Sequence, residues 1–289
     1  MKTQELTIDR HMGYAFDFKV RELKNEPTLQ YIRDSWLMAM AEMDSEQRAT
    51  WEAIYDKKNE EFLKNPPVGK DLLRWKYQRY VKEYCRTIRS VDEQVGRLLD
   101  YLEEKGVLDN TVIVYTSDQG FLLGEHGLYD KRFMYEESFR TPLIISCPSL
   151  VKKHSVCKEL VQNIDLAPTF LSLAGVEVPK EMSGRSLLPL FKNGKAENWR
   201  NELYYHFYDY PAVGSVRKHD GIRTKRYKLI HWHGEGSGND EAIDFWELYD
   251  LKKDVMEVNN VYDNPKYVKV REALTVQLEK LRKDVGVTE

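Results

Sequence analysis

The sequence has no uninterrupted apolar run of the roughly 18 residues that a membrane-spanning helix needs. It also has no basic excess, because 44 Lys and Arg stand against 47 Asp and Glu and the formal net charge is −3. Binding to nucleic acid or to a membrane surface favours a basic excess. We therefore expect neither a nucleic-acid partner nor a membrane partner.

Cysteine is scarce as well. The three cysteines, Cys85, Cys147 and Cys157, cannot all pair with one another and lack the paired spacing of a zinc site. The simplest interpretation is that they are buried or free thiols, and they do not fix the compartment.

A chain of 289 residues can bury a large core in one or two domains. Its polar start predicts helices over Leu29–Met43 and Arg48–Leu63, followed by a break at 65–69. Apolar residues then recur close to every 3.6 residues from Asp71 to Lys105, which predicts one long helix or two in tandem, with Gly106 as its C-cap.

The middle of the chain contains the strand signals. Thr111–Ser117 has the near-continuous apolar character of a strand that is covered on both faces, and with the preceding helix it predicts half of a βαβ unit. Leu143–Ser146 predicts a second short strand and Glu159–Ile164 a third. Asp165–Leu173 predicts a helix that Asp165 caps.

The last third is rich in aromatic residues and turn signals, which is typical of an antiparallel sheet. The expected strand segments are Glu202–Tyr208, Gly221–Thr224, Tyr227–His231 and Trp246–Asp250. A terminal helix is expected over Asn264–Asp284, with an apolar face. The fold class is therefore α/β, with a small antiparallel sheet and a terminal helix.

Chemistry-bearing side chains gather directly after Thr111–Ser117. Asp118 and Gln119 provide oxygen ligands that suit Ca²⁺ or Mg²⁺ better than zinc. Lys131 could neutralise a tetrahedral anion, and His126 could donate a proton or a hydrogen bond. A divalent ion and a lysine together suggest chemistry on a sulfate or phosphate ester. Asp-Gln-Gly also occurs in many purely structural turns, so both interpretations stay open on these residues alone.

The residues from Ser117 to Pro142 resemble, in identity and order, the second signature region of the type I sulfatases. The matching segments are Ser117–Gly120, Gly124–Gly127, Lys131, Tyr135–Ser138 and Arg140–Pro142. Segments around Ser90–Leu99, Asn163–Thr169, Met182–Leu187 and Trp246–Leu251 are similar to other parts of the family, in the same order. The resemblance covers about residues 70 to 284, and Asp118 through Arg140 looks closest to the N-acetylglucosamine-6-sulfatases.

The resemblance implies an alkaline-phosphatase-like fold and a sulfuric ester hydrolase acting on a sulfated amino sugar. Residues 1–195 would form the C-terminal part of the catalytic α/β domain, and 196–289 a small antiparallel subdomain. Asp118 and Gln119 match two ligands of a catalytic Ca²⁺, with Mg²⁺ as a possible substitute. Lys131 matches the lysine that contacts sulfate, and His126 matches a motif residue that either acts near the pocket or fixes the loop.

The chain departs from the family at the nucleophile, a formylglycine formed from Cys or Ser in Cys/Ser-x-Pro-x-Arg. The nearest match, Ser146–Leu150, has leucine in place of arginine and follows Lys131 instead of preceding it. The chain also has no Asp-Asp pair. We therefore expect it to be the C-terminal portion of a sulfatase, inactive alone, with the formylglycine in a preceding segment. The alternatives are a phosphodiesterase or phosphonate hydrolase on the same fold and a non-catalytic binding remnant.

The resemblance also suggests that the antiparallel sheet borders a sugar pocket. His206, His219 and Arg223 are the candidate substrate-binding residues, although they could equally be ordinary polar residues on an aromatic-rich sheet. The expected partner is a sulfated carbohydrate, such as one from glycosaminoglycan or mucin. Relatives of this kind are secreted, periplasmic or lysosomal, and the sequence fixes neither this chain's localisation nor its oligomeric state.

Overall fold

The computed structural model describes residues 18–20, 30–210, 216–236 and 241–287. The chain forms two compact units. The first comprises residues 1–97 together with 122–130, and the second comprises residues 98–121 together with 131–289. The predicted boundary near residue 195 lies inside the second unit, and the functional division at that point stays a prediction.

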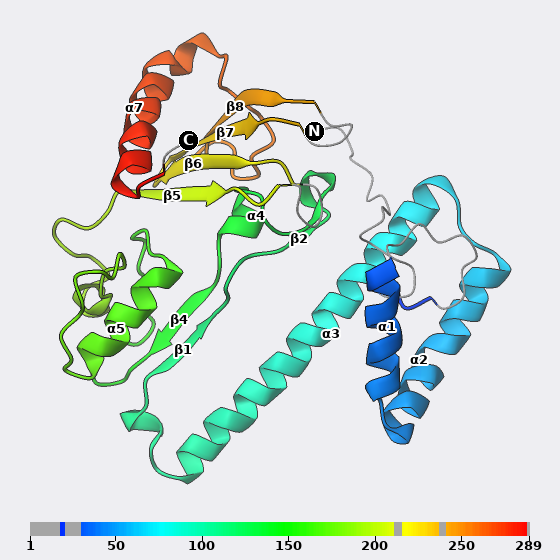
Figure 1. Cartoon of the computed structure of the whole chain (residues 1–289). Helices are drawn as coiled ribbons and strands as arrows, with labels where there is room; N and C mark the ends of the chain where they lie inside the picture. Colours follow the sequence, from blue (N-terminus) through cyan, green and yellow to red (C-terminus); the bar gives the residue numbers. More distant parts are fainter. Residues whose placement is uncertain (1–17, 21–29, 211–215, 237–240, 288–289) are drawn as a thin grey trace. The chain divides into compact units, whose positions relative to one another are not determined.

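Helices dominate the first unit (Figure 1): α1 spans Gln30–Glu42 and α2 spans Ser45–Lys64. Asp44 begins α2 in a capping box, because its carboxylate accepts from the amide of Gln47 at 2.8 Å and the Gln47 side chain accepts from the amide of Asp44 at 3.1 Å. The first turns of α3 complete the unit's apolar cluster, in which Trp75 stacks on Phe62 at a centroid distance of 4.1 Å.

The long helix is confirmed as α3, which spans Gly69–Glu104. Gly106 follows it in the left-handed region, with φ 67°, as a C-cap glycine does. Ile88, Val91 and Leu98 of its apolar stripe are exposed in the described chain.

A small hairpin also belongs to the first unit. It pairs β2 (Leu122–Leu123) with β3 (Tyr129–Asp130) and encloses the 3₁₀ turn Glu125–Gly127.

Strand β1 of the second unit spans Ile113–Thr116 and pairs antiparallel with β4, Leu143–Ser146. The prediction of a strand buried on both faces in a βαβ unit is wrong. Tyr115 is 40% exposed and Ile144 62% exposed, and the chain returns beside β1 through the segment that contains α4, Glu136–Phe139. Local apolar content predicts a strand but not the partner with which it pairs.

The segment after β4 also differs from expectation. Glu159–Ile164 forms no strand and leads into a 3₁₀ turn, Asn163–Asp165, before α5, Leu166–Leu173. The Asp165 side chain does not cap α5. It is buried, where it accepts from the amide of Arg185 at 2.8 Å and pairs with the guanidinium of Arg200.

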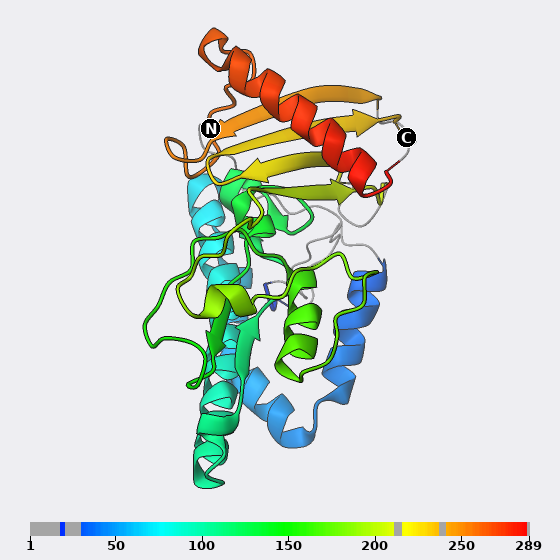
Figure 2. The same cartoon turned by 90° about the vertical axis from the view of Figure 1, so that its left-hand side faces the viewer.

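A four-stranded antiparallel sheet with a terminal helix is present as predicted (Figures 1 and 2). Its strands pair in sequence order: β5 Glu202–Phe207, β6 His219–Thr224, β7 Tyr227–Gly234 and β8 Ile243–Asp250. Helix α7, Val268–Asp284, covers one face, where Leu274 and Leu278 pack with Ile222, Leu229 and Leu248. The short α6, Leu188–Phe191, contributes to a separate cluster of buried residues.

The chain is therefore a mixed α/β protein with the expected small antiparallel sheet and terminal helix. The cysteines are free thiols, as expected, and only Cys147 is buried. Among the described residues no helix combines the length and the apolarity that crossing a membrane would require.

Candidate active site

The turn after β1 carries the two predicted metal ligands. The Asp118 side chain is exposed, and its Oδ1 accepts from the amide of Gln119 at 3.0 Å. The Ser117 hydroxyl donates to the carbonyl oxygen of Gln119 at 2.8 Å. These bonds form a tight local turn in which Asp118 is exposed and Gln119 is half-buried. Carboxylate and amide oxygens are donors that Ca²⁺ and Mg²⁺ prefer, and two residues would supply only part of the six to eight oxygens that Ca²⁺ takes.

Asn163 supports this turn from a distant part of the chain. Its side-chain Nδ2 donates to the carbonyl oxygens of Ser117 at 3.1 Å and Asp118 at 2.9 Å. This role was not predicted from the sequence, although Asn163 begins one of the segments that resemble the family. Its position at the start of that segment was the only available signal.

Gly120 links the turn to α4. Its amide donates to the carbonyl oxygen of Ser138 at 2.8 Å. A Cβ at this position would overlap the carbonyl oxygen of Glu137. Glycine is therefore required here because two backbone segments approach closely.

Lys131 begins the segment 131–140, which we call the lysine segment. The next residue, Arg132, has φ 87°, a left-handed conformation that a side chain disfavours. The Tyr205 hydroxyl of β5 donates to the carbonyl oxygen of Arg132 at 2.6 Å. Burial raises the pKa of Tyr205 to about 12, so that its hydroxyl stays protonated and able to donate at neutral pH. The backbone beside Lys131 is thus held by the sheet.

His126 lies in the 3₁₀ turn between β2 and β3, with φ 57°. The neighbouring Glu125 carboxylate accepts from the amide of Leu123 at 2.6 Å, which closes the turn. This hairpin belongs to the first unit, whereas Asp118, Gln119 and Lys131 belong to the second. Its catalytic role stays a prediction.

The three predicted substrate-binding residues lie on both faces of the sheet. His206 pairs in register with Asp220, on the face that α7 covers. His219 and Arg223 lie on the opposite face: His219 is fully buried and Arg223 pairs with Glu136 of α4. Their substrate role stays a prediction, and the contacts of His219 and Arg223 give both of them a supporting role.

The environment of His219 is aromatic. Its ring stacks on Trp232 at 4.2 Å, and its Nδ1 lies 2.8 Å from the carbonyl oxygen of Arg217. Its Nε2 is buried and has no hydrogen-bond partner among the residues that the structure describes. Burial lowers the pKa of His219 to about 4, because a charged ring would be poorly solvated here.

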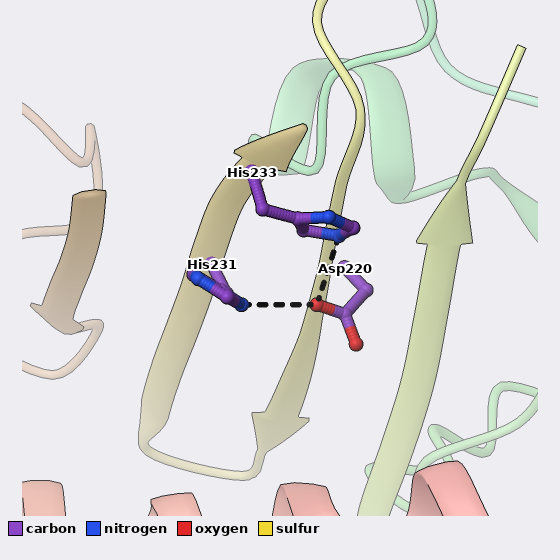
Figure 3. Close-up of side chains that lie close together, drawn as sticks. All are labelled: Asp220, His231 and His233. Carbon is purple, nitrogen blue, oxygen red and sulfur yellow. Dashed lines mark ion pairs between the residues drawn. The ribbon is translucent and has the colours of Figure 1, made fainter. Parts of the chain in front are cut away.

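Asp220, His231 and His233 form another group with metal-ligand chemistry on the sheet face that α7 covers (Figure 3). Their candidate ligand atoms all lie within 4.8 Å of one another. The Arg282 guanidinium of α7 already occupies two of these atoms, because its Nη2 lies 2.6 Å from Asp220 Oδ1 and 2.9 Å from His231 Nδ1. The guanidinium therefore supplies the positive charge that a metal ion would bring to these three residues. We interpret Asp220, His231, His233 and Arg282 as an ion-pair network that fixes α7.

The family model described as Sulfatase matches residues 36–176, and the model described as N-sulphoglucosamine sulphohydrolase, C-terminal, matches residues 124–284. The chain is 44% identical over 284 residues to the N-acetylglucosamine-6-O-sulfatase of Bacteroides thetaiotaomicron, a match that covers 98% of this chain and 49% of that protein.

Solved structures resemble the chain as well. The structure of BT4656 in complex with its substrate D-glucosamine-2-N,6-O-disulfate matches with a TM-score of 0.83 and 45% identity, over 93% of this chain and 53% of that one. A phosphonate monoester hydrolase from Silicibacter pomeroyi matches with a TM-score of 0.58 and 27% identity, over 74% of this chain and 41% of that one. The chain thus spans about half the length of these relatives.

Proposed function

This chain belongs to the sulfatase family, and we propose that it contributes metal ligands and a sulfate-binding lysine to an enzyme that removes sulfate from a sulfated amino sugar. The observation that carries the proposal is the turn of Asp118 and Gln119, which Asn163 supports within the same unit as Lys131. The amino-sugar assignment is supported by similarity to an N-acetylglucosamine-6-O-sulfatase and to an enzyme bound to a glucosamine disulfate. We propose N-acetylglucosamine 6-sulfate as the substrate type.

The sulfatase family uses a metal ion, and we propose Ca²⁺ for this chain, with Mg²⁺ as a possible substitute. The Asp118 carboxylate and the Gln119 side-chain oxygen would hold the ion. When bound, such an ion supplies a positive charge that polarises the oxygens of the ester. Asp118 is exposed and Gln119 is half-buried, so neither residue is enclosed in the core.

Lys131 is proposed to bind the sulfate group. Its ammonium is a compact cation that stabilises negative charge developing on the sulfate oxygens, and the held backbone at Arg132 restricts where it can reach. His126 lies in the first unit, and a role as a proton or hydrogen-bond donor is proposed for it from its place in the family motif alone.

The nucleophile is proposed to be the family's formylglycine. The 289 residues contain no Cys/Ser-x-Pro-x-Arg motif, from which this group forms. Binding and charge stabilisation then have no nucleophile to assist. We therefore expect this chain, purified alone, to release no sulfate, and turnover of an aryl sulfate by that preparation would contradict the expectation.

Phosphonate ester hydrolysis is the second candidate function, favoured by the similarity to a phosphonate monoester hydrolase. A third is a binding module without catalysis. Ligand preference separates the enzyme candidates: the leading proposal requires glucosamine 6-sulfate to bind more tightly than a phosphonate monoester. The reverse order would favour the phosphonate function.

The proposal is tested by calorimetric titration of the purified chain with glucosamine 6-sulfate, with and without Ca²⁺. We expect binding that needs Ca²⁺ and that weakens at least tenfold in Lys131→Gln and Asp118→Asn. The matched control is Lys153→Gln, which removes an exposed lysine that lies in a turn and is not among the proposed site residues. Equal affinity in wild type and both site variants would overturn the proposal.

A further inference from the structure

A buried lysine lies under the lysine segment. The Lys228 side chain of β7 is fully buried, and its Nζ lies 2.7 Å from Glu257 Oε1 and 2.9 Å from Glu136 Oε1. It also donates to the carbonyl oxygen of Met134 at 2.6 Å. The ammonium therefore lies beside two carboxylates and one carbonyl oxygen, and two of these three groups belong to the lysine segment.

Glu257 continues the network to the backbone. It is fully buried with φ 49°, a left-handed conformation that costs free energy for a residue with a side chain. Its Oε2 accepts from the amide of Glu136 at 2.6 Å, at the first residue of α4. Arg223 of β6 closes the group by pairing with Glu136 at 3.2 Å.

Other residues of the lysine segment also contact the sheet face that carries Lys228 and Arg223. The Tyr205 hydroxyl donates to Arg132, as described above, and the Tyr135 hydroxyl donates to Glu247 of β8 at 3.1 Å. Gly221 of β6 leaves room for Met134, because a Cβ there would lie 2.6 Å from the Met134 sulfur. Contacts from β5, β6, β7 and β8 thus converge on residues 132–136.

A gain in the free energy of folding does not by itself explain why charged residues are buried at this position. Removing charges from water costs free energy that their attraction offsets only in part, and apolar residues of similar size often stabilise as well or better. Burial acts to raise the pKa of both carboxyls. The pKa of Glu257 is raised, because burial outweighs the attraction of Lys228. The pKa of Glu136 is held below its usual value, because Lys228 and Arg223 together outweigh burial. What apolar side chains cannot supply is directional bonding to the Met134 carbonyl and the Glu136 amide, which selects one register of the segment.

We propose that Lys228 and Glu257 are positioning residues for Lys131, because they fix the lysine segment in one register on the sheet. The ammonium of Lys131 is then presented to a sulfate group without first ordering its own loop, which would reduce the entropic cost of binding. This inference rests on the sulfate-binding role proposed for Lys131. It adds that the backbone next to Lys131 is held by buried charged residues that lie 90 or more residues further along the chain.

The test replaces the buried pair by apolar residues, in the double variant Lys228→Met with Glu257→Leu. Amide hydrogen exchange within residues 131–140 is expected to become about tenfold faster, as loss of one hydrogen bond would produce, while exchange in β7 and α7 stays unchanged. The affinity for glucosamine 6-sulfate is expected to fall by a similar factor, with the affinity for Ca²⁺ unchanged. The control replaces the more exposed pair Lys225 and Glu159, 2.7 Å apart, by the same residue types.

A milder variant keeps the inference testable if the double variant does not fold. Tyr205→Phe removes only the hydroxyl that donates to Arg132, and it is expected to speed exchange at residues 131–134 selectively. Unchanged exchange and affinity in the folded variants would overturn the inference and leave the proposed function intact. If the wild-type chain bound no sulfated sugar, the proposed function would fail together with the binding part of the inference, whereas the exchange comparison would still decide the support of the segment.

Discussion

The side-chain amide of Asn163 lies 2.9 Å from the carbonyl oxygen of Asp118, although 45 residues separate them in the chain. Through this bond and its companion to Ser117, Asn163 fixes the turn that presents the proposed metal ligands, from the 3₁₀ turn that precedes α5. Residues that orient a metal ligand without touching the metal commonly affect affinity by tenfold or more.

Replacing Asn163 with alanine should weaken Ca²⁺ binding about tenfold, because the turn loses both bonds that fix its backbone. Titration of the purified chain with Ca²⁺ measures the effect, and Asn201→Ala, at an exposed position, is the control. Unchanged Ca²⁺ affinity in Asn163→Ala would show that the turn holds its conformation without this side chain.

Gly120→Ala should lower the free energy of unfolding by about 3 kcal/mol, because the added Cβ overlaps the Glu137 carbonyl oxygen and the backbone has to shift. The matched control is Gly96→Ala in α3, where a Cβ meets nothing within 4 Å. That change should stabilise by about 0.5–1 kcal/mol, because alanine is the better helix former. Urea unfolding of both variants measures the contrast, and a mild effect at Gly120 would contradict the close approach.

His219 should make the protein less stable as the pH falls. Its pKa is about 4 in the folded chain against about 6.5 when unfolded, so the unfolded state binds more protons between these values and stability is lost as pH drops through this window. The loss attributable to His219 is about 2 kcal/mol between pH 7 and pH 5.

Urea unfolding at both pH values measures this loss, and His219→Phe should remove it. His154→Gln, at an exposed position, should leave it in place. A wild-type pH dependence that persisted in His219→Phe would assign the effect to other groups.

Arg282→Ala should uncover a metal site. In the native protein Zn²⁺ is not expected to raise the melting temperature, because the guanidinium occupies Asp220 Oδ1 and His231 Nδ1. Without it, Asp220, His231 and His233 offer carboxylate and imidazole ligands that suit zinc.

The variant should be about 3–5 kcal/mol less stable without metal, since the Asp220 carboxylate is left buried and poorly paired. Added Zn²⁺ should restore part of this stability, and thermal melts with and without Zn²⁺ measure both effects. Lys283→Ala, next in the chain, is the control. Zn²⁺ stabilisation of the native protein would contradict the assignment of this group as an ion-pair network.

Elements with local signals could be predicted from the residues alone. The 3.6-residue spacing from Asp71 to Lys105 predicted α3, aromatic-rich segments between turn signals predicted β5–β8, and an apolar face predicted α7, because such patterns depend on neighbours within a few positions. The pattern of residues from Asp118 to Arg140 indicated the family. It also identified the turn and the lysine that carry the proposed chemistry.

Tertiary structure alone decided which of these residues support one another. The antiparallel partner of β1 and the pairing of Asp165 with Arg200 leave no local trace in the sequence. Lys228 contacts Met134, which lies 94 residues away in the sequence. Glu257 contacts Glu136, 121 residues away, and Arg282 contacts Asp220, 62 residues away. A buried charge is stable only beside a partner, and that partner is chosen by the packing of the sheet and not by spacing along the chain.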